Sequence, residues 1–243
     1  MFKGVKKKKK FEEVLDQIKE LLRTKKLKTG QKLPTEIELS ESMGISRSSL
    51  REALTILSIL GIVEGKSGEG TIIKQAQPEN LKSIMSLVVV SKGLDMHELF
   101  ETRVLIEKEA AGLAAKKRHD SDLQNIFHIL SEAEQKYSKI TEGEQADFDF
   151  LFHKSIVEAS QNRMLSVLVE VISDLLEEQI RTTRSELATS PQVLQRFQNE
   201  HWMIYESIKN RHADEASQLM EDHLVNSQAG IDFLREENDK SKV

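Results

Sequence analysis

The feature that most constrains the fold of this chain is a helical periodicity that very little interrupts. Among 243 residues, proline occurs at positions 34, 78 and 191 alone, and few segments alternate apolar and polar residues with period two. Both observations favour helices, because proline disrupts a helix interior and strict alternation is typical of strands. Beyond residue 80 the pattern predicts helices near 81–91, 95–117, 120–139, 144–161, 164–187, 191–210 and 213–236. No repeat period emerges, so we expect a mainly α protein whose larger part is an antiparallel helical bundle and not a solenoid.

A change in charge divides the chain near Pro78. Residues 1–74 contain 16 Lys or Arg and 10 Asp or Glu, whereas residues 75–243 contain 19 and 30. A basic segment is typical of a nucleic-acid binder, because Lys and Arg displace counterions from phosphates. The predicted divisions are a basic tail (1–8), a DNA-binding domain (9–75), a linker (76–80), a helical domain (81–237) and a C-terminal tail (238–243). The run from Lys6 to Lys10 is either a solvated, disordered tail or an arm that binds DNA.

Composition excludes several classes of protein. The chain has no cysteine, which excludes a disulfide framework, a thiolate metal cage and a cysteine nucleophile and suits a reducing compartment. The basic start is not followed by the apolar core of a signal peptide. The longest apolar run, about 84–90, falls far short of the roughly 20 residues that span a bilayer. We therefore expect a cytoplasmic protein that does not contact a membrane.

Two helices separated by a tight turn are predicted within residues 35–60. Thr35 and Glu38 have the spacing of a capping box, so a short helix begins there and ends near Gly44. Ser46 is placed to cap the next helix, whose apolar positions continue to residue 60. With an earlier helix over about 11–22, these elements predict a helix-turn-helix. The β-branched runs 62–64 and 71–73 flank a glycine-rich loop and predict a hairpin, which would be the wing.

The start of the third helix carries the residue types that read DNA. In a recognition helix the N-terminal residues enter the major groove, where arginine binds guanine and hydroxyl groups bind phosphates or base edges. Residues with this chemistry are Ser46, Arg47, Ser48, Ser49 and Arg51, and the wing adds Lys66, Gly68 and Gly70. Two arginines four residues apart are, by themselves, more often an exposed surface pair. Here they follow a capped helix and precede a hairpin, which favours DNA binding.

One carboxylate and three imidazoles are predicted to face the interior of the helical domain. Asp149 and His153 are four residues apart and share a helix face, while His201 and His223 each lie beside apolar positions. Imidazole and carboxylate ligands suit zinc, nickel, iron or manganese, and bundle cores build such sites from facing helices. A small carboxylate would then occupy the open coordination positions. The alternative is that each histidine is an ordinary core or surface residue.

The N-terminal segment resembles the winged helix-turn-helix of the GntR family over roughly residues 9–74. The residues that carry the resemblance are 32–36 (Lys-Leu-Pro-Thr-Glu), 45–54 (Ile-Ser-Arg-Ser-Ser-Leu-Arg-Glu-Ala-Leu), 61–63 (Gly-Ile-Val) and 68–71 (Gly-Glu-Gly-Thr). The resemblance implies that Arg47, Ser48, Ser49 and Arg51 contact an operator and that Gly68 and Gly70 belong to the wing. Ile37 departs from the family pattern, because many members carry a polar residue there. The resemblance therefore does not extend to a contact from this position of the second helix with the DNA backbone or a base.

Residues 80–230 resemble the ligand-binding FCD domain of the FadR subfamily. The resemblance rests on 98–103, 149–153, 159–162, 200–201 and 220–224. It implies a homodimer and a divalent metal, zinc first, held by Asp149, His153, His201 and His223. It also implies that Arg103 and Asn162 bind the effector. The alternatives are that Arg103 forms an ion pair with Glu107 at i,i+4 and that Asn162 only terminates a helix.

Together these patterns predict a DNA-binding transcription regulator and not an enzyme. The resemblance implies that its affinity for double-stranded operator DNA changes when a small organic acid binds at the metal, and in this the chain resembles regulators of lactate and related acid use. Two alternatives remain open. One is an Asp/His metalloenzyme fused to a nucleic-acid-binding module, because a metal with open positions activates water. The other is an architectural DNA binder that responds to no ligand.

Overall fold

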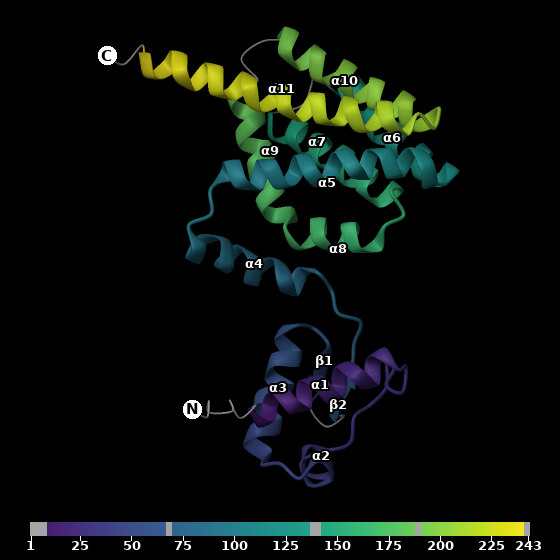
Figure 1. Ribbon diagram of the computed structural model, residues 1–243, viewed down its shortest axis with the longest axis vertical. Coiled ribbons are helices and arrows are strands. Elements are labelled where there is room, and N and C mark those ends of the chain that lie inside the picture. Colours follow the sequence, from purple (N-terminus) through teal and green to yellow (C-terminus); the bar gives the residue numbers. More distant parts are fainter. Residues whose placement is uncertain (1–8, 67–69, 137–141, 188–190, 241–243) are drawn as a thin grey trace, which may run out of the picture. The chain divides into compact units, whose positions relative to one another are not determined.

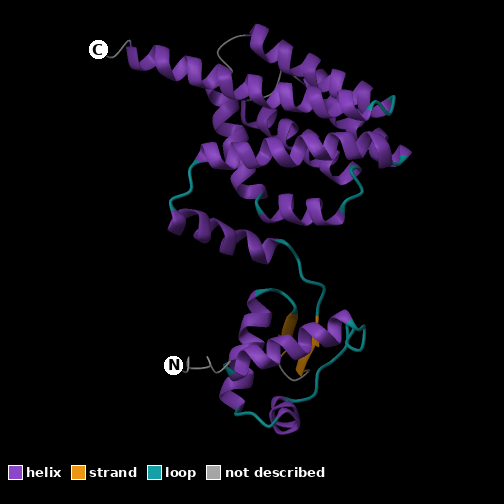
Figure 2. Ribbon diagram, in the orientation of Figure 1, coloured by secondary structure: helices purple, strands orange, loops and turns teal. Residues whose placement is uncertain are grey.

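A computed structural model describes residues 9–66, 70–136, 142–187 and 191–240. The chain forms two compact units, Met1–Ser83 and Ile84–Val243, and the division falls inside helix α4 (Glu79–Lys92) (Figure 1). Figure 2 shows that the strands are confined to the first unit and that the second unit is built from helices. The expected mainly α fold, with a small hairpin after a helix-turn-helix, is confirmed.

The first unit is a three-helix cluster closed by a two-stranded sheet. Its elements are α1 (Lys10–Arg23), α2 (Glu36–Met43), α3 (Arg47–Ile59), β1 (Val63–Lys66) and β2 (Gly70–Ile73). The strands pair antiparallel, with Val63 opposite Ile73 and Lys66 opposite Gly70. The core that holds α3 against its neighbours consists of Val14, Ile18, Leu27, Leu33, Leu50, Ala53, Leu54, Leu57, Val63 and Ile73.

The helix ends in this unit form as the sequence predicts. Thr35 and Glu38 make a reciprocal capping box at the start of α2, and Gly44 ends that helix in the left-handed conformation with φ of 61°. Ser46 accepts a hydrogen bond from the backbone N–H of Ser49 at 3.1 Å. These bonds satisfy backbone groups that a short helix leaves without partners, so they fix where α2 stops and α3 begins.

The second unit is an all-helical bundle. After α4 it contains α5 (Met96–Lys117), α6 (Asp120–Lys136), α7 (Glu142–Ala159), α8 (Arg163–Val171), α9 (Ser173–Leu187), α10 (Pro191–Lys209) and α11 (Ala213–Lys240). Helix α5 packs against α11, α7 and α10 (Figure 1), and its apolar core includes Ala111, Phe152, Ile204 and Leu224. Within the described ranges, none of the helices combines the length and hydropathy needed to cross a membrane.

Two predicted helix boundaries in this unit are wrong. The single helix expected over 164–187 is two helices, α8 and α9, which meet at Ile172. Residues 165, 169, 172 and 176 all belong to one apolar cluster, so their helical spacing continues across the break and conceals it. The helix expected from residue 144 begins two residues earlier, at Glu142, so Gly143 lies inside α7.

Candidate functional site

Four side chains from three helices meet in the interior of the second unit. Asp149 and His153 come from α7, His201 from α10 and His223 from α11, and each is at most 7% exposed. One ligand atom from each residue lies within 4.8 Å of the others. The Nε2 atoms of His201 and His223 are 3.1 Å apart, and Asp149 Oδ1 is 3.3 Å from His201 Nε2. The structure thus brings together all four residues that the sequence predicts as a metal site.

Local helix geometry explains why these residues converge. Asp149 and His153 are separated by one turn and therefore share a face of α7. Helices α10 and α11 form a hairpin whose turn includes Arg211, with φ of 62°. His201 precedes this turn and His223 follows it by similar numbers of residues. With a rise of about 1.5 Å per residue, the two rings come to the same level of the hairpin.

Each of two histidines has a carboxylate on its outer side. Glu200 Oε2 lies 2.7 Å from Nδ1 of His223 in a hydrogen bond. Glu107 Oε2 lies 2.5 Å from Nδ1 of His153, although these two atoms are not aligned as a hydrogen bond. A carboxylate at Nδ1 favours a proton on that atom and leaves the Nε2 lone pair for a metal. The sequence analysis did not predict this role for either glutamate. The signals in the sequence are that Glu107 follows Arg103 by four residues and that Glu200 directly precedes His201.

Burial and charge set the protonation of this cluster. Burial alone would raise the pKa of Glu107, but Arg103 and His153 lower that pKa to about 2, so the carboxylate is ionised at neutral pH. Burial lowers the pKa of His223, against the opposing effect of its hydrogen bond to Glu200. His223 is therefore a neutral imidazole at pH 7, which is the form that binds metals.

The cluster suits a divalent transition metal. Nε2 of His153 is buried and has no hydrogen-bond partner among the described residues, and Asp149 Oδ1 is 3.9 Å away. A buried polar atom without a partner costs about 1–3 kcal/mol, and a cation at this position would accept its lone pair. Phe152 stacks on the His201 ring with centroids 4.2 Å apart and provides an apolar wall. Three imidazoles and one carboxylate are ligands that zinc, nickel, iron and manganese accept.

The two predicted effector residues have local partners. Arg103 is 4% exposed, and its Nε donates to Glu107 Oε1 at 2.7 Å, so the predicted ion-pair alternative is present. The side-chain oxygen of Asn162 accepts from the backbone N–H groups of Met164 and Leu165. Asn162 therefore caps the start of α8. An effector contact from either residue stays a prediction.

The other candidate site is the start of α3 in the first unit. Arg47 and Ser48 are exposed, and Arg47 makes no ion pair with the described residues. Arg51 Nε donates to Glu36 Oε2 on α2 at 2.7 Å. Within the described residues, an ion pair therefore holds the side chain of Arg51, but not that of Arg47. Half of the surface of Ile37 is exposed, which shows that this apolar residue is not used in the core.

The hairpin beside α3 adds a lysine that the sequence analysis missed. Gly70 has φ of 87°, and a Cβ at this position would lie 2.9 Å from Cε of Lys32. Lys32 therefore covers the start of β2, and its backbone forms a bridge with Ile72. Lys66 ends β1, whereas Gly68 lies outside the described residues. Lys32 thus places a further positive charge at the base of the predicted wing.

Comparison with known families divides the chain in the same way as the two candidate sites. The model of the FCD domain matches residues 98–226, which include all four cluster residues. The model described as "Bacterial regulatory proteins, gntR family" matches residues 10–73, which include α1 to β2. Each candidate site therefore lies inside one matched segment.

Individual relatives match nearly the whole chain. The HTH-type transcriptional regulator LutR of Bacillus subtilis (strain 168) is 36% identical over 90% of this chain and 99% of its own. The Glc operon transcriptional activator of Escherichia coli (strain K12) is 29% identical over 88% of this chain and 85% of its own. Among solved structures, Streptococcus agalactiae GntR is 23% identical, covers 90% of this chain and 99% of its own, and has a TM-score of 0.64, which supports the fold alone.

Proposed function

The chain belongs to the gntR family of bacterial regulatory proteins and carries an FCD domain, and on this premise we propose that a metal-bound organic acid controls its binding to DNA. Membership of this family makes the protein a metabolite-responsive transcription regulator. The observation that carries the finer proposal is the buried cluster of Asp149, His153, His201 and His223 within the FCD segment.

In this proposal the first unit reads a two-fold operator as part of a homodimer. The exposed start of α3 supplies Arg47, Ser48 and Arg51 to the major groove, and the hairpin lies against a phosphate or the minor groove. Arg47 is adaptable because it has no ion-pair partner among the described residues. The hydrogen bond to Glu36 holds the side chain of Arg51 in one orientation. Dimerisation matches the symmetry of the protein to that of a palindromic site.

In the second unit the four cluster residues would hold a divalent transition metal, with zinc as the first choice. A bound ion supplies a positive centre with coordination positions left for a carboxylate. Phe152 limits access of water to one side through its stacking on His201. The guanidinium of Arg103 has N–H donors beyond the Nε that binds Glu107, and in this proposal they bind the carboxylate of the effector. The acid must bind one arrangement of the protein better than another in order to change its affinity for DNA.

The test uses zinc-loaded protein and a duplex selected from a random-sequence pool by the wild-type chain. L-lactate, D-lactate, glycolate, pyruvate and succinate serve as probes in fluorescence-anisotropy titrations. We expect at least one acid to change the Kd for DNA by about 5–150-fold, the usual range of allosteric coupling. The variant with His201→Ala and His223→Ala should lose this response. His212→Ala is the matched control, because His212 is an exposed histidine in the same hairpin.

Two results would contradict the proposal. One is an acid response that persists in the doubly substituted protein or in metal-stripped wild type. The other is a wild-type protein that binds zinc and converts an acid or ester to product without any effect on DNA binding, which would favour the metalloenzyme alternative.

A further inference from the structure

Arg103, the buried arginine beside the cluster, is linked to one of the cluster histidines through Glu107. We infer that Glu107 is a positioning residue that connects Arg103 to His153, so that Arg103 controls metal affinity without touching the metal. This inference rests on the proposed metal site and names residues beyond its four ligands.

The connection is a chain of three side chains. Arg103 Nε donates to one carboxylate oxygen of Glu107 at 2.7 Å, and the other oxygen lies 2.5 Å from Nδ1 of His153. The three residues are 4%, 3% and 3% exposed. Arg103 and Glu107 are one turn apart on α5, which packs directly against α7 and its His153.

Because Arg103, Glu107 and His153 are buried, the loss of any one of them leaves its neighbour without a partner. Water cannot take the place of a lost partner where all three side chains are at most 4% exposed. Glu107 needs Arg103 to neutralise its charge and to hold the plane of its carboxylate. The negative charge of that carboxylate, 2.5 Å from Nδ1 of His153, favours a proton on Nδ1 and keeps Nε2 available to the cluster. Removing the arginine therefore releases the carboxylate and, through it, the imidazole.

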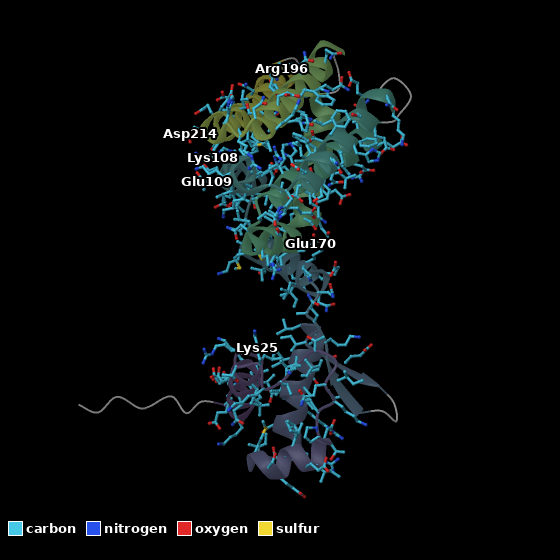
Figure 3. The ribbon with its side chains drawn as sticks, turned by 90° about the vertical axis from the view of Figure 1, so that its right-hand side faces the viewer. Lys25, Lys108, Glu109, Glu170, Arg196 and Asp214 are labelled. Carbon is cyan, nitrogen blue, oxygen red and sulfur yellow. The ribbon has the colours of Figure 1, made fainter. Side chains whose placement is uncertain are left out.

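A second arrangement in the same unit provides a natural comparison. On α10, Arg196 Nε lies 3.3 Å from Glu200 Oε1 at the same i,i+4 spacing, and Glu200 contacts Nδ1 of His223. Here the arginine side chain is 49% exposed and the glutamate 19% exposed, and Figure 3 shows Arg196 at the outside of the helical unit. Water can replace Arg196. Two arrangements of the same three residue types thus differ mainly in burial.

The experiment measures zinc affinity with no organic acid present, by competition with a chromophoric chelator. Arg103→Met should weaken zinc binding by about 10–100-fold, the usual cost of losing an outer partner of a metal-binding histidine, whereas Arg196→Met should change it by less than about threefold. Glu107→Gln should weaken it as much as Arg103→Met, and the two substitutions together should cost no more than Glu107→Gln alone. Cobalt absorption spectra should shift for the Arg103 and Glu107 variants and match wild type for Arg196→Met.

The melting temperatures of the metal-free variants separate this role from a purely structural one. A variant that melts like the wild type but binds zinc more weakly has kept its fold and lost only the effect on the metal. Arg103→Lys, which keeps the buried charge but not the planar fork, serves if Arg103→Met fails to fold, and it should still weaken zinc binding by more than about threefold. Equal zinc affinities for the Arg103 and Arg196 variants would overturn the inference and leave the metal site standing. A wild-type protein that binds no zinc would overturn both.

Discussion

Removing the metal should lower the melting temperature of the helical unit and leave the DNA-binding unit unchanged. In the helical unit, three imidazoles and a carboxylate are held within 4.8 Å of one another, and His153 Nε2 has no partner among the described residues. A metal that binds this arrangement and not the unfolded chain stabilises the fold by mass action. The first unit has its own core and contributes none of the four ligands.

The expected size follows from the affinity and the size of the unit. Zinc at 100 times its Kd contributes about 2.7 kcal/mol. For units of roughly 150–250 residues, each kcal/mol shifts Tm by about 2–4 °C. The helical unit, residues 84–243, falls in this class. Stripping the metal should therefore lower its Tm by about 5–11 °C, and by less where the histidines of the unfolded chain also bind zinc.

Trp202 makes the melting measurement specific to the helical unit. It is the single tryptophan of the chain and packs edge-on against Tyr205 inside the helical unit. Its fluorescence therefore follows the melting of this unit alone, with chelator or with excess zinc. The variant carrying Asp149→Asn and His153→Ala, which leaves the neighbours of Trp202 in sequence intact, should show no zinc-dependent shift. A wild-type midpoint that is the same with chelator and with zinc would refute the reasoning.

Three further predictions concern single side chains. Arg47→Ala should cost about 1–3 kcal/mol of specific DNA binding and relax one operator position, and anisotropy titrations with single-base variants of the selected duplex would contradict this by showing unchanged sequence preference. Phe152→Ala should destabilise the helical unit by about 3–5 kcal/mol, because Phe152 is fully buried, and urea unfolding followed at Trp202 measures the loss. The pKa of His223 is lowered from 6.5 by burial, so its contribution to the stability of the metal-free fold is present above pH 6.5 and lost as pH falls through the lowered value. Between pH 8 and pH 5, the free energy of unfolding measured with urea should fall less for His223→Ala than for wild type. Equal losses in the two proteins would contradict this prediction.

Local features of this protein were predictable from neighbouring residues. The capping box at Thr35, the left-handed Gly44 and the cap at Ser46 depend on bonds that span three or four residues, so the sequence contains all the groups involved. The same is true of the shared face of Asp149 and His153. The break at Ile172 escaped prediction because apolar spacing continues through it and no proline or glycine marks it.

The sequence by itself determined the capped helix ends of the first unit, the hairpin and the inventory of possible metal ligands, because each follows from periodicity or from bonds between near neighbours. Tertiary structure alone decided which carboxylate stands behind which histidine. Arg103–Glu107 and Arg196–Glu200 have the same spacing in the sequence. Packing of α5 against α7 and α11 buries the first pair, whereas the second pair, on α10, stays partly exposed. Burial excludes water and strengthens charge interactions, and it depends on which helix faces meet.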